Sequence, residues 1–323
     1  MGKTPYTHFN IDTELCMAHS HAGIEVYNAG QTAHLLDYPA LVEAIAQAAA
    51  ELERGEIISP ERLVVPLGQG GVMLSMPATA SDLAIHKLVN VQPHNGALGL
   101  PTIHGAVSLC DARTGAIRAV LDGPEVTGRR TAAVSMLAIG TLLPCTPCSV
   151  VLYGTGVQAR HHVQALAALY PKAQVWVRSR SQQSAEAFCR ACAPWHSNLA
   201  PCPNELPEAA DVVILLTTSL EPVYDLPGQA GRLVIGVGAF KPEMAEIGPQ
   251  TLASSQLFAD EPDGARHEAG DLLRARVDWA QVNSLASALR GQVDLTLPVV
   301  FKSVGTGAWD LAAGRVAWGS MGL

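Results

Sequence analysis

The sequence predicts an α/β protein that combines a doubly wound parallel sheet domain with a mixed α+β domain. Two observations carry this prediction. From residue 149 onward, apolar runs typical of buried strands alternate with helical patterns, as in a parallel sheet covered by helices. Between residues 62 and 122, short β-rich runs are separated by Gly and Pro, which is typical of an antiparallel sheet. The 323 residues suffice for about two domains of ordinary size.

Composition and charge exclude several classes of protein. With 48% hydrophobic and 15% charged residues, the chain is not intrinsically disordered. The 21 basic and 29 acidic residues give a net charge of −8 without a Lys/Arg cluster, so we expect no nucleic-acid partner. The uncharged stretch 131–159 is interrupted by Gly140, Pro144 and Pro147, which argues against a membrane-spanning helix. The first residues lack the apolar core of a signal peptide, and the expected location is the cytoplasm.

Seven cysteines, an odd number in a long chain, indicate reduced thiols. Cys145/Cys148 and Cys189/Cys192 have the spacing of zinc ligands. The gap between the pairs is far longer than in usual zinc modules, so small apolar side chains packed in the core are the favoured interpretation. We therefore expect no metal.

The elements of the first domain follow in order. Apolar residues at three- and four-residue steps predict a helix over residues 35–53. Strands are predicted for the runs LVVP, VMLSMP, IHKLVNV, GAVSLCD and IRAVL, which form a mostly antiparallel sheet of about five or six strands. Residues 1–30 have weak periodicity and predict no element.

The second domain begins with a helix predicted to start at Thr127 and to end before Pro144. Strand 149–153, helix 158–169, strand 174–178, helix 184–192 and strands within 211–218 and 232–238 follow. A Gly-rich turn at 303–307 then leads into a final helix, which we expect to pack back on the first domain. The expected division is 1–126 with 300–323 for the first domain and 127–299 for the second.

A dinucleotide-binding fingerprint follows the strand at 149–153. It consists of Gly154, Thr155, Gly156, Val157 and Gln158, with Ala159 at the position where a small residue lets helix and strand pack closely. The first glycine permits a tight turn, and the second lets the backbone approach a pyrophosphate at the helix N-terminus. Because the motif lies between a strand and a helix, the second domain is predicted to be a Rossmann-type NAD(P)-binding domain.

The end of the next strand indicates which dinucleotide binds. An NAD site usually carries an acidic residue there, but this chain has Arg178, Ser179 and Arg180. Guanidinium groups form charge-assisted hydrogen bonds with a 2′-phosphate, so the predicted cofactor is NADPH. NADH stays open as an alternative, as does a merely solvated basic loop.

Three basic residues outside the fingerprint are candidates for binding an anionic substrate. Lys87 lies within an apolar strand pattern, where an ammonium needs a partner or a ligand. Arg130 lies near the predicted start of a helix, where the dipole disfavours a cation unless an anion binds. Arg62 precedes the first strand of the sheet. Ordinary ion pairing is the alternative for each of them.

Several motifs together resemble the ornithine cyclodeaminase/mu-crystallin family. They are VTGRRTAAVS at 126–135, GTGVQA at 154–159, KLVN at 87–90, LPT at 100–102 and FKSVG at 301–305 with Asp310. The resemblance covers roughly residues 31–323. It implies a nucleotide domain and a substrate domain that also forms a homodimer.

The resemblance also implies roles for individual residues. Arg62 and Lys87 match residues that contact the substrate, and Arg130 matches the arginine that binds its carboxylate and lies against the cofactor. Thr102 matches a threonine near the nicotinamide. Val237 and Ser303 fall in segments that line the nicotinamide pocket.

One departure from the family pattern separates its activities. Cyclodeaminases and the archaeal alanine dehydrogenases of the family carry an Asp where this sequence has Phe240, and Phe can neither accept a proton nor pair with an ammonium. The phrase GAFKPEMAEI is similar to that of reductases of cyclic imines with a carboxylate. We therefore expect NADPH-dependent reduction of Δ1-pyrroline-2-carboxylate to L-proline and of Δ1-piperideine-2-carboxylate to L-pipecolate, a cyclic imino acid being the small-molecule partner.

Lys87 is the expected proton donor, directly or through water, with His104 as the runner-up; the alternative role for Lys87 is only to orient the substrate carboxylate. His86 is expected on the opposite face of the strand from Lys87. His161 and His162 are expected to be structural or surface residues, Asp310 to cap or pair within the final helix, and Asp260 to lie in a solvated loop. The alternative functions are an ornithine cyclodeaminase, an alanine- or opine-type dehydrogenase, and a non-catalytic ligand-binding protein similar to mu-crystallin.

Overall fold

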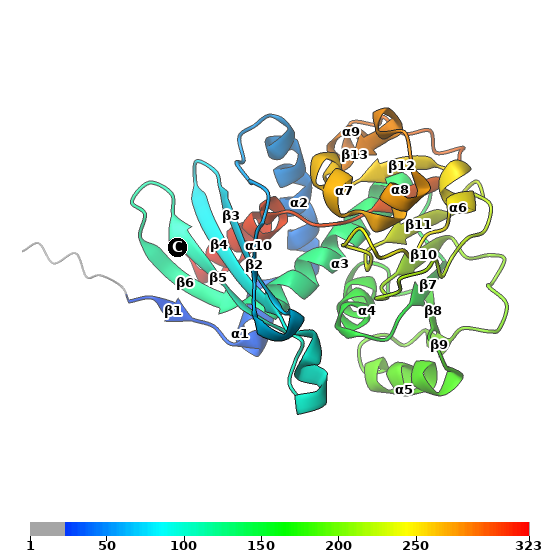
Figure 1. Cartoon of the computed structure of the whole chain (residues 1–323), viewed down its shortest axis with the longest axis horizontal. Coiled ribbons are helices and arrows are strands. Elements are labelled where there is room, and N and C mark those ends of the chain that lie inside the picture. The colour runs from blue at the N-terminus through cyan, green and yellow to red at the C-terminus, as the bar shows by residue number, and fades with distance from the viewer. Residues whose placement is uncertain (1–22, 323) are drawn as a thin grey trace, which may run out of the picture.

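The first of two sheets has six strands. The computed structural model describes residues 23–322, and Figure 1 shows two lobes joined through a long central helix. The strands are β1 (Glu25–Val26), β2 (Leu63–Pro66), β3 (Val72–Thr79), β4 (Leu83–Val91), β5 (Ile103–Asp111) and β6 (Ile117–Asp122). Their order is β1-β6-β5-β4-β3-β2, and every pair is antiparallel except β1 with β6. The predicted mostly antiparallel sheet is therefore confirmed. Residues 1–22, which the prediction includes in the first domain, and residue 323 lie outside the described residues.

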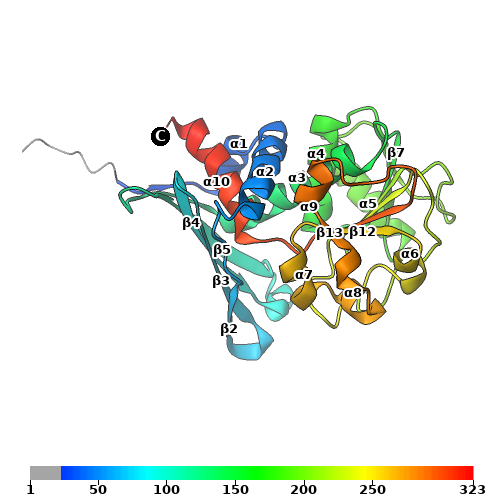
Figure 2. The same ribbon diagram turned by 90° about the horizontal axis from the view of Figure 1, so that it is seen from above.

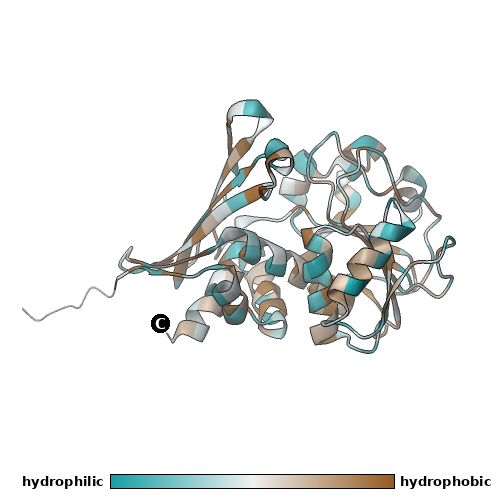
Figure 3. Cartoon of the chain, turned by 90° about the horizontal axis from the view of Figure 1, so that it is seen from below, coloured by the Kyte–Doolittle hydropathy of each residue, from teal (hydrophilic) through white to brown (hydrophobic). Residues whose placement is uncertain are grey.

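Three helices of the first lobe lie on one side of this sheet, where the last of them packs directly on β3 and β4. They are α1 (Ala29–Leu35), α2 (Tyr38–Glu53) and α10 (Gly307–Met321), and Figure 2 shows α2 and α10 lying on the side of the sheet that faces the other lobe. Alternation along the strands fits this cover, since Ile85 and Val89 of β4 are buried while Leu88 is exposed. Hydrophobic and hydrophilic segments likewise alternate along these strands in Figure 3. The return of the final helix to the first domain is thereby confirmed.

The second sheet has eight parallel strands. They are β7 (Ser149–Tyr153), β8 (Gln174–Arg178), β9 (Leu199–Pro201), β10 (Val212–Leu215), β11 (Leu233–Gly236), β12 (Gln256–Ala259), β13 (Val282–Ser284) and β14 (Val299–Lys302). The order β13-β12-β14-β11-β10-β7-β8-β9 reverses direction at β7, which makes β7 and β10 the topological switch point of a doubly wound sheet. The predicted Rossmann-type fold is confirmed. Because β14 belongs to this sheet, the segment that returns to the first domain starts after residue 302 and not at 300.

The remaining helices flank the second sheet. They are α4 (Val157–Leu169), α5 (Gln182–Cys192), α6 (Pro249–Ala253), α7 (Pro262–Glu268), α8 (Gly270–Ala275) and α9 (Leu285–Leu289). Short 3₁₀ turns form at η1 (Gly68–Gly70), η2 (Pro93–Leu98) and η3 (Trp279–Gln281). The sequence predicted α4 and α5 to within two residues but assigned no elements between α6 and α9.

The central helix α3 (Gly123–Leu142) begins earlier than the prediction from Thr127. The Asp122 carboxylate accepts a hydrogen bond from the Glu125 N–H at 2.8 Å, and Pro124 occupies the first turn, both of which favour a helix start. The predicted start was therefore wrong by four residues, and Arg130 lies inside the helix, not near its N-terminus. The division expected between residues 126 and 127 falls within α3, which packs against both lobes. No helix among residues 23–322 is long and apolar enough to span a membrane.

Candidate active site

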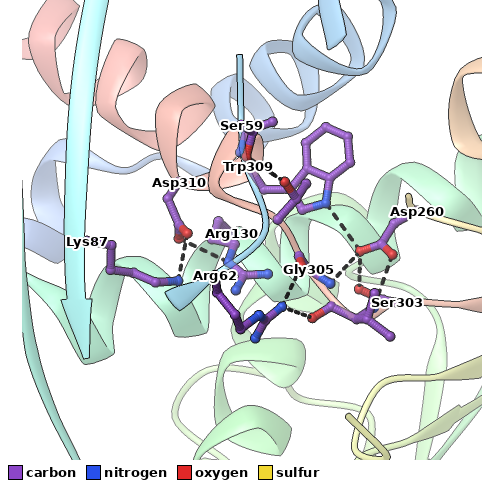
Figure 4. A network of polar contacts seen from close by, with 12 residues as sticks. Ser59, Arg62, Lys87, Arg130, Asp260, Ser303, Gly305, Trp309 and Asp310 are labelled. Carbon is purple, nitrogen blue, oxygen red and sulfur yellow. Dashed lines mark hydrogen bonds and ion pairs between the residues drawn. The ribbon is translucent and has the colours of Figure 1, made fainter. Parts of the chain in front are cut away.

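Lys87 and Arg130 converge on one carboxylate between the two lobes. The Lys87 ammonium on β4 lies 2.6 Å from Oδ2 of Asp310, and Nε of Arg130 on α3 lies 3.2 Å from its Oδ1 (Figure 4). All three residues are buried, Asp310 completely. The expectation that Asp310 pairs within its own helix was wrong, because its partners come from β4 and α3.

Arg62, in the segment before β2, lies beside the cluster of Lys87, Arg130 and Asp310. Its Nε lies 2.8 Å from Glu268, and its Nη2 donates to the Gly305 carbonyl at 2.9 Å. Lys87 and Arg130 thus share the single carboxylate of Asp310, which leaves one positive charge of this group unpaired, while Arg62 pairs with Glu268. Desolvated charge of this kind is costly unless a partner neutralises it, so the cluster is suited to one anionic group of a ligand.

Arg62 also lines a cavity that residues of both lobes enclose. The cavity has a volume of about 740 Å³. Met76 and Trp309 contribute apolar surface to it, while Gly305 and Glu268 lie beside Arg62. This volume is within the range of ordinary small-molecule sites.

Burial sets the protonation of Lys87. Desolvation lowers the pKa of its ammonium to about 8, the Asp310 charge opposes this shift, and the Arg130 charge adds to it. An amine with such a pKa holds a proton at neutral pH and releases it more readily than an exposed lysine does.

The nearby histidines lie on the other face of the sheet. His86 is exposed and its ring nitrogen contacts the Ser75 hydroxyl at 2.8 Å, as the strand alternation predicted. His104 pairs with Asn90 of β4, which places it on the same face as His86 and away from Lys87. His104 is therefore not a competing proton donor to the Lys87 site within this chain.

The fingerprint loop has the backbone that a dinucleotide requires. Gly154 has φ +116°, and a Cβ there would lie 2.7 Å from the Leu216 carbonyl oxygen. Gly156 faces open space and begins α4 without a side-chain cap, so the first N–H groups of the helix are free to bind an anion. The side-chain oxygen of Gln158 is buried and has no hydrogen-bond partner among residues 23–322. The glycine backbone and the uncapped start of α4 fit a pyrophosphate bound at this turn.

Two arginines border the end of β8. Arg178 donates from Nη1 to the Tyr153 hydroxyl at 3.2 Å, and its Nη2 donates to the Asn204 carbonyl. Arg180 is exposed and forms no ion pair or hydrogen bond within the part of the chain that the structure describes. No acidic side chain pairs with either arginine among these residues, so the positive charge stays available to a phosphate.

Sequence reasoning missed two buried carboxylates at the carboxyl edge of the parallel sheet. Glu246 accepts hydrogen bonds from the backbone N–H of Thr217, Gly238 and Ala239, at 2.5, 2.6 and 3.0 Å. It thereby holds the ends of β10 and β11. Asp260, expected in a solvated loop, is 4% exposed and accepts from the residues after β14. That expectation was wrong.

Of the other predicted cofactor residues, Val237 and Ser303 lie at the carboxyl edge of the parallel sheet, and Thr102 lies beside the six-stranded sheet. Val237 and Ser303 are buried directly after β11 and β14, at the edge where a doubly wound sheet binds its ligand. Thr102 is exposed just before β5, and its carbonyl accepts from the Gln92 N–H at 2.8 Å. Phe240 is 37% exposed, with the Lys241 ammonium 5.9 Å from its ring centre.

The cysteine pairs have different surroundings. Cys189 and Cys192 are buried on α5 and pack in the core, whereas Cys145 and Cys148 are exposed before β7. Among residues 23–322, no group of three or more His, Cys, Asp or Glu side chains could hold a metal ion.

Comparison with known proteins agrees with this architecture. A model of the ornithine cyclodeaminase/mu-crystallin family matches residues 26–321. The chain is 56% identical over 295 residues to the Delta(1)-pyrroline-2-carboxylate/Delta(1)-piperideine-2-carboxylate reductase of Azospirillum brasilense, a match that covers 91% of this chain and 95% of that protein.

Solved structures share the fold of both lobes. The Thermococcus litoralis Delta(1)-pyrroline-2-carboxylate reductase in complex with NADH and L-proline aligns with a TM-score of 0.83 at 24% identity, covering 92% of this chain and 97% of that one. An archaeal alanine dehydrogenase dimer with bound NAD aligns with a TM-score of 0.82 at 22% identity, covering 92% and 95%.

Proposed function

The chain belongs to the ornithine cyclodeaminase/mu-crystallin family, and from this membership and the site geometry we propose that it reduces cyclic ketimines with NADPH. The substrates are Δ1-pyrroline-2-carboxylate and Δ1-piperideine-2-carboxylate, and the products are L-proline and L-pipecolate. The relative from Azospirillum brasilense carries both substrates in its name. The observation on this chain that carries the proposal is the pairing of Lys87 and Arg130 on Asp310 beside Arg62.

The cation cluster accounts for substrate binding. Arg62 and Arg130 bind the substrate carboxylate, which neutralises the one positive charge that Lys87 and Arg130 retain on Asp310. Arg130 keeps its orientation because Nε is held by Asp310, which leaves the outer nitrogens of its guanidinium for the ligand.

Lys87 supplies the proton. Reduction of the ring adds a hydride at C2 and a proton at the ring nitrogen, and a protonated imine accepts hydride far more readily than a neutral one. The Lys87 ammonium, with its pKa lowered to about 8, donates that proton directly or through water. Asp310 holds the Lys87 amine in place during the transfer.

The cofactor half is the lobe that begins within α3 and ends with β14, and the substrate half is the lobe of the six-stranded sheet together with the segment that returns to it after residue 302. When bound, NADPH supplies the hydride. Gly154, Thr155, Gly156, Val157 and Gln158 bind its pyrophosphate. Arg178, Ser179 and Arg180 bind the 2′-phosphate, which favours NADPH over NADH. Thr102, Val237 and Ser303 are assigned to the nicotinamide side, with Arg130 between cofactor and substrate.

Phe240 favours an imine over an open-chain diamine. It follows Gly238 and Ala239, which Glu246 fixes at the end of β11. A phenyl ring packs against a hydrocarbon ring but offers nothing to an ammonium group. Phe240 therefore supports ketimine reduction better than it supports ornithine cyclodeamination or open-chain dehydrogenation.

The uncovered face of the six-stranded sheet is assigned to a homodimer contact. Val26, Leu63, Leu88 and Ile117 point to this face and are 73, 62, 37 and 44% exposed. An exposed apolar face of this kind is typical of a subunit interface. A second copy of this chain is the proposed occupant, in line with the dimeric archaeal relative.

Steady-state kinetics test the proposal. Purified protein is mixed with NADPH and either cyclic imine, and in parallel with ornithine and NAD. We expect NADPH oxidation with both imines and no ammonia from ornithine. Ammonia and proline from ornithine without turnover of the imines would overturn the assignment and show that Phe240 does not separate the activities.

A further inference from the structure

Asp260, directly after β12, is a buried carboxylate that binds five donors. Its Oδ1 accepts from the backbone N–H of Glu261 and Val304, both at 3.0 Å. Its Oδ2 accepts from the Ser303 hydroxyl at 2.8 Å, the Gly305 N–H at 2.9 Å and the Trp309 indole N–H at 3.2 Å. Figure 4 shows Asp260 facing this group of donors.

None of these donors is a cation, and no Lys, Arg or His forms an ion pair with Asp260 within residues 23–322. A buried carboxylate of this kind is stabilised only by its hydrogen bonds. Since four of the five come from residues 303–309, the carboxylate fixes the path of the chain from β14 into α10.

The segment 303–305 touches both halves of the site. Ser303 lies at the cofactor edge of the parallel sheet, while the Gly305 carbonyl accepts from Arg62 at 2.9 Å. Gly305 also packs closely on the other substrate arginine, since a Cβ there would lie 2.6 Å from Nη1 of Arg130. With φ +80°, Gly305 adopts a conformation that other residues rarely take.

We propose that Asp260 is a positioning residue that couples the two halves: it holds residues 303–305 so that Ser303 meets the nicotinamide and the Gly305 carbonyl orients Arg62 toward the substrate carboxylate. This inference rests on the proposed function. Both carboxylate oxygens of Asp260 accept from donors of the chain itself, so its effect is carried through Ser303 and Arg62.

The Asp260→Asn variant tests this role because it keeps the shape of the side chain. An amide offers only one acceptor oxygen, so either the Val304 and Glu261 N–H groups or the Gly305 and Trp309 donors lose their partner. We expect the KM for Δ1-pyrroline-2-carboxylate to rise about tenfold and the Kd for NADPH, measured by fluorescence without substrate, to rise about fivefold.

Asp211 provides a matched control at the opposite edge of the same sheet. Its Oδ2 accepts from the backbone N–H of Cys148 and Ser149 at 2.7 and 2.8 Å, before β7. The KM and the Kd of both variants, Asp211→Asn and Asp260→Asn, are measured at one temperature that lies below the melting temperature of each. We expect Asp211→Asn to leave the KM and the Kd unchanged. Wild-type values of both constants in Asp260→Asn would overturn the proposal.

A double-mutant cycle tests the route through Arg62. If Asp260 acts by orienting Arg62, the rise in KM in Asp260→Asn largely disappears in an Arg62→Ala background. Fully additive effects on KM would contradict that route.

If Asp260→Asn does not fold, the Trp309→Phe variant is used to test the same role of Asp260. This substitution removes the indole donor together with part of the buried ring and leaves the Asp260 carboxylate in place, so we expect smaller rises in both constants, whereas a lower melting temperature with unchanged constants would contradict the proposal. NADPH titration does not require turnover. A wild-type protein that reduced neither imine would therefore count against the proposed function and leave the effect of Asp260 on cofactor binding measurable.

Discussion

Lys87 and Asp310 form a buried ion pair at 2.6 Å although 223 positions separate them in the sequence. One residue comes from the middle of the six-stranded sheet and the other from the first turn of the last helix. The contact therefore forms only when α10, which follows the parallel sheet in the sequence, packs on the first domain. In this way the fold of the whole chain sets the protonation of its proposed proton donor.

The Asp310 charge raises the pKa of Lys87, while burial lowers it to about 8. Asp310→Asn removes the charge, so the pKa of Lys87 falls further. If the ammonium form is the active one, kcat/KM for the imine is high below this pKa and falls as pH rises through it. We expect the alkaline limb of the pH profile to move by about one unit toward acid in Asp310→Asn.

His86→Gln is the control for this profile, because His86 neighbours Lys87 but faces the other side of the sheet. Its alkaline limb should match that of the wild type. An unshifted limb in Asp310→Asn would show that the pH dependence does not arise from Lys87.

Arg180→Ala is expected to weaken the binding of NADPH but not that of NADH. Arg180 is exposed at the end of β8, and a guanidinium there contacts a 2′-phosphate that NADH lacks. We expect the KM for NADPH to rise about tenfold and the KM for NADH to stay nearly constant. Arg190→Ala, at an exposed position on α5, should change neither constant. Equal effects of Arg180→Ala on both cofactors would assign this arginine no part in selectivity.

Phe240→Asp tests the discrimination between imine and diamine chemistry. A carboxylate at this position repels the substrate carboxylate and replaces the apolar contact with the ring. We expect kcat/KM for both imines to fall at least about tenfold, whereas Phe240→Leu keeps most of the activity. Unaltered kinetics in Phe240→Asp would place residue 240 outside the substrate pocket.

His162 links the stability of the protein to pH. It is fully buried on α4, contacts the Ser135 hydroxyl at 2.9 Å, and has its pKa lowered by desolvation from 6.5 to about 4. Between these two pH values the unfolded chain binds more protons than the native one, so stability falls as pH drops from 6.5 toward 4.

One such histidine contributes a slope of at most about 1.4 kcal/mol per pH unit. Urea unfolding at pH 5 and pH 7 should show a smaller pH dependence for His162→Gln than for the wild type. His94→Gln changes an exposed histidine and should preserve the wild-type dependence. An identical pH dependence of stability in all three proteins would mean that His162 is not buried in its neutral form in the native protein.

Local patterns predicted most of the fold. The alternation that buries Ile85 and Val89 also placed Lys87 and His86 on opposite faces of the strand, and the glycines at 154 and 156 predicted the turn between β7 and α4. The early start of α3 was also present in the sequence, since Asp122 and Pro124 are ordinary helix-start residues.

The carboxylates that organise the site could not be found in the same way. Asp260 and Asp310 stand among residues typical of a loop and of a helix start, and neither has a local partner that signals burial. Apart from the neighbouring Glu261 N–H, the partners of Asp260 lie 43 or more positions away in the sequence, and those of Asp310 lie 180 or more positions away. Only the tertiary structure shows that these charges are enclosed.

The most direct test of the central claim follows the hydride itself. NADPH carrying deuterium at both C4 positions of the nicotinamide is incubated with Δ1-pyrroline-2-carboxylate and the purified protein, and the product is examined by chiral chromatography and mass spectrometry. We predict L-proline with one deuterium at C2. Unlabelled product, D-proline, or no proline at all would contradict the assignment of this chain as a ketimine reductase.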